Sequence, residues 1–471
     1  MRDTLFALLR QPSCALRVGA LWKSELRPKH DLCEAGGPLL AVDSSAFKFA
    51  YAAAPCDLPK REALMICIKL LAGVAWLIGG VMNSPKPGIA EAAQDGRGGS
   101  AAQGQAVSVF GATDGLRAFF TVADVLRRVQ SGALEAFGLG LQESPYQIVT
   151  TGSYWCLRDY ATRSTSPSLL IVAAPIKRPY IWDIAPSVSA IRRCLQEGFH
   201  VYLIEWTPEA DRTQNSGLDE HSKAISECVA MITRQAGGRR PYLTGHSLGG
   251  TLAGIFSALE PASVRGLVLL GAPLCFEPAT SKFRDALVAL LPSDVSEADS
   301  FPGSLLSYMA ALAAPGTFFW SRLLDAALSV TDGHALEIHA LVERWSLDEV
   351  AVPGKLVHQI IQWLFRENRF CRGTLEVCGA VVGSSSLSVP TFAVVNTADE
   401  IAPLTSIKAC IDAMPVTDAR IIKYPGETGV GLQHLGVLVG RQAHARVWPE
   451  IIAWLKGHKQ IQGAETNQGA E

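Results

Sequence analysis

The sequence predicts an α/β fold in which a mostly parallel sheet is covered by helices on both faces. Apolar runs of strand length recur through residues 145–277, and helical patterns of ten to twenty residues or so separate them. Two further strand-like runs follow near the C-terminus. Continuous apolar strands that alternate with helices are typical of parallel sheets buried on both faces.

The expected elements follow in a regular order. An antiparallel pair comes first, four buried strands then alternate with helices, and two strands follow a long insertion. The strands are expected at 146–151, 154–160, 168–174, 199–206, 242–245, 265–271, 390–396 and 420–424, with helices at 188–197 and 218–235.

The most informative motif is Gly-His-Ser-Leu-Gly at residues 245–249, followed by Gly250. A short β-type run enters it and a small-residue helix pattern leaves it. A strand that turns sharply into a helix holds the middle residue in a strained conformation and lifts its hydroxyl clear of the sheet. Ser247 is therefore the predicted nucleophile. The alternative is a glycine-rich turn with an incidental serine.

A serine nucleophile needs a base and an orienting acid, which α/β-hydrolases supply in the chain order Ser, Asp or Glu, His. Asp399 comes just after the strand expected at 390–396, and His434 comes after the glycine-rich loop that follows the last strand. The carboxyl ends of parallel strands meet at one edge of the sheet, so both side chains are expected to face Ser247. Glu400 is the alternative acid, and Asp399 is preferred because it is nearer the strand end.

An acyl-transfer site also needs donors for the oxyanion of the tetrahedral intermediate. The backbone N–H of Leu248, next to the nucleophile, is the expected first donor. The loop after Ala174 occupies the place of the second, for which Ile176 and Lys177 are the candidates.

Beyond the elbow, several segments match a known family in order. They are 175–186 (PIKRPYIWDIAP), 205–206 (EW), 217–220 (GLDE), 245–252, 345–354 (WSLDEVAVPG), 367–370 (ENRF) with Gly373, 399–403 (DEIAP) and 434–440 (HLGVLVG). Over residues 146–455 the chain resembles the polyhydroxyalkanoate synthases and their α/β-hydrolase relatives. The resemblance implies that Asp399 and His434 are the acid and the base.

The chain departs from this family at the elbow, where the polymerases carry cysteine and this chain carries Ser247. A cysteine keeps the bound acyl chain as an activated thioester, whereas a serine forms an ester that water or an alcohol attacks. We therefore expect a serine hydrolase or acyltransferase acting on hydroxyacyl esters or coenzyme A thioesters. The alternatives are a genuine poly(3-hydroxyalkanoate) polymerase that uses Ser247, and a non-catalytic scaffold or granule-associated protein.

The expected organisation is one catalytic core interrupted by a helical cap. The cap would lie over the active site as a lid, and its alternative roles are a dimer interface or a second small core. The helical segment before the core would pack beside the sheet or against a partner. The ranges are 1–62 for an N-terminal extension, 63–82 for an apolar helix, 83–106 for a flexible linker, 107–144 for the helical segment, 145–277 and 390–456 for the core, 278–389 for the cap, and 457–471 for a disordered tail.

Residues 63–82 form an apolar stretch long enough to cross a bilayer, interrupted by Lys69. Three interpretations compete. The stretch is a membrane anchor, or a signal peptide if translation starts at Met65, or an apolar helix that docks on the catalytic unit or on a hydrophobic polymer surface.

Composition excludes several classes of function. The 42 Lys and Arg nearly balance the 44 Asp and Glu, and no basic stripe with interleaved aromatics suggests a nucleic-acid partner. The 11 cysteines lack metal-ligand spacing, which indicates reduced thiols, a cytoplasmic location and no metal. We expect no cofactor. The expected partners are an acyl ester, an acyl-coenzyme A or a polyester, with membrane or granule contact through residues 63–82 and homodimer formation left open.

Overall fold

The computed structural model describes residues 113–160, 166–207, 216–291, 297, 300–416 and 418–461. All of them lie within Lys60–Glu471, the second of the two units into which the chain divides. The predictions for the N-terminal extension, for residues 63–82, for the linker and for most of the tail therefore lie outside the described residues.

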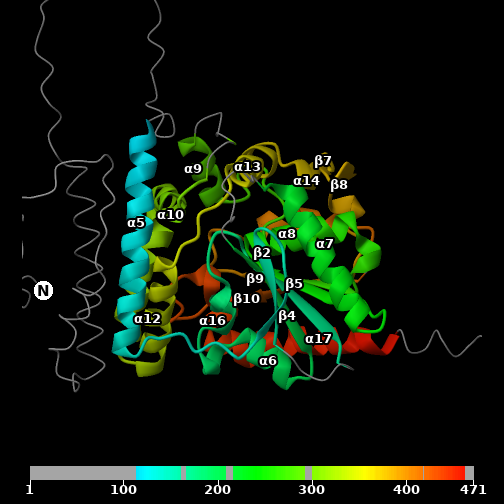
Figure 1. Cartoon of the computed structure of the whole chain (residues 1–471), viewed down its shortest axis with the longest axis horizontal. Helices are drawn as coiled ribbons and strands as arrows, with labels where there is room; N and C mark the ends of the chain where they lie inside the picture. Colours follow the sequence, from blue (N-terminus) through cyan, green and yellow to red (C-terminus); the bar gives the residue numbers. More distant parts are fainter. Residues whose placement is uncertain are drawn as a thin grey trace, which may run out of the picture. The chain divides into compact units, whose positions relative to one another are not determined.

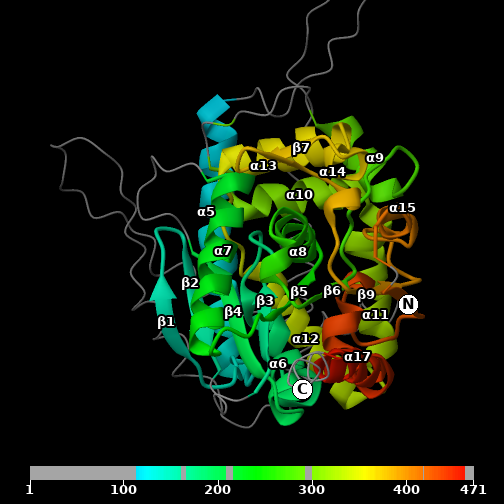
Figure 2. The ribbon, with the colours of Figure 1, turned by 90° about the vertical axis from the view of Figure 1, so that its right-hand side faces the viewer.

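An eight-stranded sheet forms the centre of the fold, in the order β1-β2-β4-β3-β5-β6-β9-β10 (Figures 1 and 2). The strands β1 and β2 pair antiparallel with each other, β2 pairs antiparallel with β4, and all other pairs are parallel. The predicted mostly parallel α/β sheet is thus confirmed. The strand bounds are β1 Gln147–Thr151, β2 Trp155–Asp159, β3 Ser168–Val172, β4 His200–Trp206, β5 Tyr242–His246, β6 Gly266–Leu270, β9 Thr391–Asn396 and β10 Ala419–Tyr424.

Alternating side chains of the strands build two separate apolar cores, one on each face of the sheet. In β3, Leu170 and Val172 pack in one core with α7 (Leu218–Gln235) and α8 (Leu248–Leu259). The neighbouring Leu169 and Ile171 pack in the other core, with α6, α16 and α17. Figure 1 shows these helices on opposite sides of the strands. The bounds of the latter helices are α6 Ala190–Gln196, α16 Gly436–Val439 and α17 Trp448–Ile461.

The chain between β6 and β9 forms the insertion predicted as a helical cap. It also contains a two-stranded hairpin that the sequence did not predict, because strands of three residues carry too little pattern. This hairpin packs on α7 and α8. The elements are α9 Lys282–Leu290, α10 Gly303–Ala313, η5 Gly316–Trp320, α11 Ser321–Ser329, α12 Gly333–Leu347, α13 Gly354–Gln359, η6 Ile360–Arg366, α14 Arg369–Arg372, β7 Leu375–Val377 and β8 Ala380–Val382.

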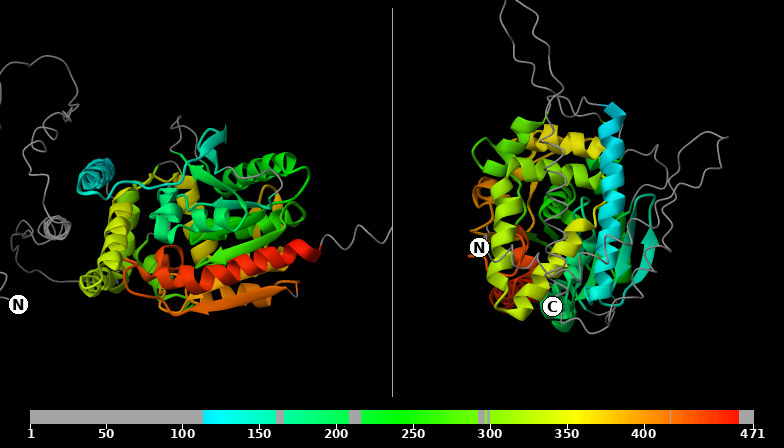
Figure 3. Two further views of the ribbon diagram at one scale, coloured as in Figure 1. Left: turned by 90° about the horizontal axis from the view of Figure 1, so that it is seen from below. Right: turned by 90° about the vertical axis from the view of Figure 1, so that its left-hand side faces the viewer.

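Helix α5 (Thr113–Ala133) packs on the cap helices α10 and α12 and not beside the sheet, which is visible in Figure 3 as the cyan helix beside the cap. Phe120 is buried, with its ring 5.6 Å from that of Tyr308 of α10. The outer face of α5 stays apolar and exposed through Phe119, Val122 and Leu126.

Short elements complete the described fold. They are η1 Leu134–Phe137, η2 Pro179–Asp183, η3 Pro186–Val188, η4 Pro261–Ser263, η7 Ser384–Ser386, α15 Thr405–Asp412, η8 Gln433–Leu435 and η9 Ala443–Val447. Among the helices of the described ranges, none combines the length and the apolarity that a membrane span needs.

Candidate active site

Ser247 occupies the sharp turn between β5 and α8. Its backbone has φ 53° and ψ −131°, a strained combination for a residue with a side chain. The turn is fixed by two backbone hydrogen bonds. The Ser247 N–H donates to the Leu270 carbonyl at 3.1 Å, and the Thr251 N–H donates to the Ser247 carbonyl at 3.0 Å. Ser247 itself is only half-buried, so the strand-to-helix turn presents its side chain at the edge of the sheet.

The glycines of the motif are required by close packing of backbones. A Cβ on Gly249 would lie 2.3 Å from the Val172 carbonyl oxygen at the end of β3. A Cβ on Gly250 would lie 2.7 Å from the Gly245 carbonyl oxygen. These contacts bring the first turn of α8 against the end of β3, and larger residues would push the turn away from the sheet.

Asp399 and His434 meet at the carboxyl edge of the same sheet. The Asp399 Oδ2 and His434 Nδ1 atoms are 2.6 Å apart, and both side chains are buried. The other carboxylate oxygen, Oδ1, accepts from the backbone N–H groups of Ile401 at 2.8 Å and Ala402 at 3.2 Å. Burial acts to raise the pKa of Asp399, but the charge and hydrogen bond of His434 and the two backbone donors outweigh it and hold that pKa below its usual range.

The opposite ring nitrogen of His434, Nε2, is buried and has no hydrogen-bond partner among the described residues. Because Asp399 engages Nδ1, the geometry favours the tautomer in which Nε2 is free to accept a proton. Gly271 connects this ring to the elbow. It follows Leu270, which binds the Ser247 N–H, and a Cβ on it would lie 3.7 Å from His434 Cε1.

Glu400, the alternative acid, points elsewhere. It is exposed, and its carboxylate accepts a hydrogen bond from the Thr317 hydroxyl in the cap. The neighbouring carboxylates therefore have different partners: Asp399 binds the imidazole, and Glu400 binds the cap.

The predicted oxyanion donors lie on two adjoining backbones. Leu248 is the first residue of α8, so its N–H is one of those without an intrahelical acceptor. The chain after β3 passes this helix end and continues through a turn at Ile176 to Lys177. Lys177 forms an isolated antiparallel bridge with Glu349 of the cap. The assignment of Leu248 with Ile176 or Lys177 as oxyanion donors stays a prediction.

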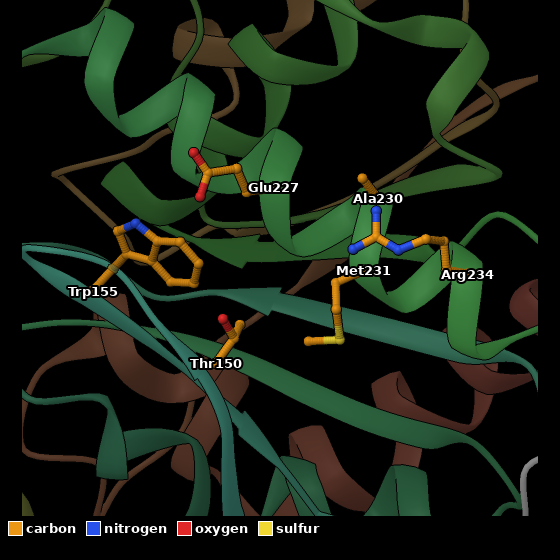
Figure 4. A pocket seen from close by; sticks show the side chains of 6 residues that line it. All are labelled: Thr150, Trp155, Glu227, Ala230, Met231 and Arg234. Atoms are coloured by element: carbon orange, nitrogen blue, oxygen red, sulfur yellow. The ribbon is translucent and has the colours of Figure 1, made fainter.

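A cavity of about 260 Å³ lies near the β1 end of the sheet, between β1, β2 and α7 (Figure 4). None of the predicted catalytic residues lines it, so it is separate from the candidate active site. Its lining residues are Thr150, Trp155, Glu227, Ala230, Met231 and Arg234.

Comparison with known proteins agrees with this architecture. A family model described as the alpha/beta hydrolase fold matches residues 182–410, which include Ser247 and Asp399. A poly(3-hydroxyalkanoate) polymerase subunit PhaC from Haloferax mediterranei is 28% identical over 331 residues, covering 69% of this chain and 66% of its own. Proteins of the same name from Haloarcula marismortui and Allochromatium vinosum are each 27% identical, covering 61% and 68% of this chain and 60% and 90% of theirs.

The chain has the α/β-hydrolase fold and is similar to the polyhydroxyalkanoate polymerases. The aligned region spans about two thirds or less of the Haloferax and Haloarcula proteins, and most of the length of the Allochromatium protein. In this chain the elbow residue is Ser247. Cys228 and Cys275 are both buried, the first within α7 and the second beyond β6.

Sequence reasoning missed His246, the residue before the nucleophile. Its ring is buried, lies 4.6 Å from the ring of His434 between centroids, and places Nε2 2.8 Å from the His434 carbonyl oxygen. Since a carbonyl only accepts, His246 Nε2 is the donor. Burial, with His434 nearby, lowers the pKa of His246 to about 3, so the ring is neutral. The motif leaves this position free, and only the fold brings it to the backbone of His434.

We expect Gly249→Ala to distort the turn that carries Ser247, because its new methyl group would collide with the carbonyl oxygen of Val172. Labelling of Ser247 by a fluorophosphonate probe should fall by about 10²-fold or more, since small displacements of reacting groups are costly. The matched control is Gly132→Ala in α5, where a Cβ would meet no atom within 4 Å. Equal labelling of the two variants would contradict the role assigned to Gly249.

The low pKa of His246 predicts a pH dependence of stability. The unfolded chain binds a proton at this histidine near pH 6.5, whereas the folded protein does not until about pH 3. This group therefore contributes stability that is fully present above pH 6.5 and is lost as the pH falls. Between pH 7 and pH 5 its share of the loss is about 2 kcal/mol.

Denaturant unfolding of wild type and His246→Gln at both pH values measures this share. The glutamine can still donate to the His434 carbonyl but does not titrate. The unfolding free energy of the variant should fall by about 2 kcal/mol less between pH 7 and pH 5 than that of the wild type. Parallel losses in both proteins would show that His246 is not held neutral.

Proposed function

We propose that this chain is a serine-dependent acyltransferase or hydrolase that acts on hydroxyacyl esters or coenzyme A thioesters. Ser247 is the nucleophile, His434 is the general base, and Asp399 orients the imidazole and stabilises its charged form. The single observation that carries the proposal is the buried imidazole of His434, which is bonded to Asp399 through Nδ1 and leaves Nε2 without a partner among the described residues.

The reaction follows from these roles. Ser247 Oγ attacks the acyl carbonyl while His434 Nε2 takes the hydroxyl proton. The tetrahedral intermediate collapses, the bond to the leaving group breaks, and His434 returns its proton to that group as a thiol or an alcohol. Water or another alcohol then attacks the serine ester by the same steps in reverse, which releases the acyl product and restores Ser247.

The serine nucleophile favours hydrolysis or a single acyl transfer over the growth of a polymer chain. The polyhydroxyalkanoate synthases that this chain resembles carry a cysteine at the elbow. A thioester formed on that cysteine stays reactive toward the next hydroxyl group. An ester on Ser247 is a less activated acyl donor. With a histidine base beside it, attack by water or a small alcohol is the expected fate.

Polymerisation of hydroxyacyl units is the second candidate, since the three relatives are named poly(3-hydroxyalkanoate) polymerases. In both candidates the protein uses no cofactor, and coenzyme A enters only as the leaving group of the substrate. A polyester would be the product in the second case. Contact of residues 63–82 with a membrane or granule, homodimer formation and a cytoplasmic location stay predictions.

A fluorophosphonate probe tests the nucleophile. We expect it to label wild type and Ser388→Ala, a control at an exposed serine outside the site, and not Ser247→Ala. Labelling of Asp399→Asn should be slower by on the order of 10⁴-fold, since the imidazole loses the partner that sets its tautomer. A folded wild type that no probe labels would be a scaffold.

The products formed from (R)-3-hydroxybutyryl-coenzyme A separate the two enzymatic candidates. A serine hydrolase releases one free hydroxy acid for each coenzyme A thiol. A polymerase also releases the thiol, but it joins the hydroxyacyl groups into insoluble polyester. The variant Ser247→Cys is the informative comparison, because restoring the family's thiol should shift product toward polyester if the nucleophile sets the outcome. Polyester from the wild type would show that the serine ester supports chain growth, and it would overturn the preference for hydrolysis or simple transfer.

A further inference from the structure

A buried carboxylate of the cap accepts hydrogen bonds from the loop that carries the proposed base, His434. Asp325 of α11 is 7% exposed. Its Oδ1 accepts from the Gly429 N–H at 2.8 Å, and its Oδ2 accepts from the Gly431 N–H at 2.8 Å. Both glycines lie in the loop between β10 and His434, so a single cap side chain binds two amides of that loop.

The loop is also held by the surface of α12. Gly429 and Gly431 have φ values of 88° and 69°, and a Cβ on them would lie 2.6 Å from Ala335 Cβ and 2.7 Å from Val342 Cγ1, respectively. The loop is therefore wedged against the helix with its amides turned toward Asp325. A displacement of α11 or α12 would move the loop with it.

Asp325 also contacts a polar cluster inside the cap. His339 Nδ1 lies 2.8 Å from Asp325 Oδ2, and His339 Nε2 lies 3.8 Å from Glu343, which pairs with Arg322. Burial acts to raise the pKa of Asp325, but His339 and the two glycine amides outweigh it and hold that pKa below its usual range. The ionised form of Asp325, which accepts from the loop amides, is therefore favoured.

A second buried cap carboxylate holds the other side of the candidate site. Glu349 accepts from Lys177 Nζ at 2.7 Å, and the two residues form a backbone bridge. Lys177 belongs to the loop after β3, where the second oxyanion donor is predicted. The cap is therefore bonded to both loops that flank Ser247.

We propose that Asp325 is a positioning residue for His434: the cap sets the place of the base through the Asp325 bonds to Gly429 and Gly431. The inference rests on the proposed function only in assigning proton transfer to His434. It implies that α11 and α12 form a fixed wall of the site and that any opening of the cap occurs elsewhere.

The experiment compares Asp325→Asn with Asp124→Asn in the full chain. Asp124 is a matched control, because it is equally buried at 7% and its carboxylate also accepts from two backbone amides of the cap, those of Gly303 at 3.1 Å and Ser304 at 2.8 Å. Asparagine keeps the shape but turns one acceptor into a donor that faces an N–H. Both variants should lose stability, and only Asp325→Asn should affect the base.

Two readouts separate positioning from stability, both taken well below the unfolding temperature of each variant. The rate of fluorophosphonate labelling should fall by about tenfold or more in Asp325→Asn and by less than about twofold in Asp124→Asn. The downfield proton resonance of His434 Nδ1–H, identified by its loss in Asp399→Asn, should broaden or shift in Asp325→Asn and stay unchanged in Asp124→Asn.

The outcomes are distinguishable. Equal labelling rates and an unchanged resonance in both variants would overturn the role of Asp325. If wild type is not labelled, the proposed function fails, and the resonance alone still decides this inference. If Asp325→Asn does not fold, amide hydrogen exchange in the wild type is the deciding measurement. Slow exchange at Gly429 and Gly431 would support their hydrogen bonds to Asp325, and exchange as fast as that of an open loop would overturn the inference.

Discussion

The strained backbone at Ser247 is the constraint on which the rest of the structure depends. Such a conformation costs of order 1–3 kcal/mol and persists only when its surroundings enforce it. Here β5 is buried along its whole length between β3 and β6, and α8 packs directly back onto the sheet. The hydrogen bond from Ser247 to the Leu270 carbonyl closes the turn. The apolar cores on both faces of the sheet therefore stabilise the strained turn at Ser247.

Parallel strands bring chemistry from distant parts of the chain to one edge. Ser247 follows β5 directly, Asp399 comes three residues after β9, and His434 comes ten residues after β10. The hydrogen bond of Asp399 and His434 then depends on loop conformations that the sheet alone does not define. His246 and Asp325 supply two of the missing restraints, one from the elbow strand and one from the cap.

The cap is bonded to two loops of the candidate site. Its carboxylates at positions 325 and 349 bind the loop before His434 and the loop after β3, and α5 packs on its helices α10 and α12. A freely moving lid would break these buried hydrogen bonds and ion pairs. The loss of each one would leave a polar or charged group without a partner. We therefore expect any movement that admits a substrate to occur in parts of the insertion that make no such bonds to the loops.

The sequence by itself determined the succession of strands and helices in the core, the strand-to-helix turn at Ser247 and the presence of an acid and a histidine after the last strands. These features rest on local periodicity, glycine spacing and chain order, which a linear pattern records. It could not determine the β7–β8 hairpin, the packing of α5 on the cap, or the contacts of His246 and Asp325. Those depend on which groups meet across long stretches of chain, and only the tertiary structure decides where a buried carboxylate finds its donors.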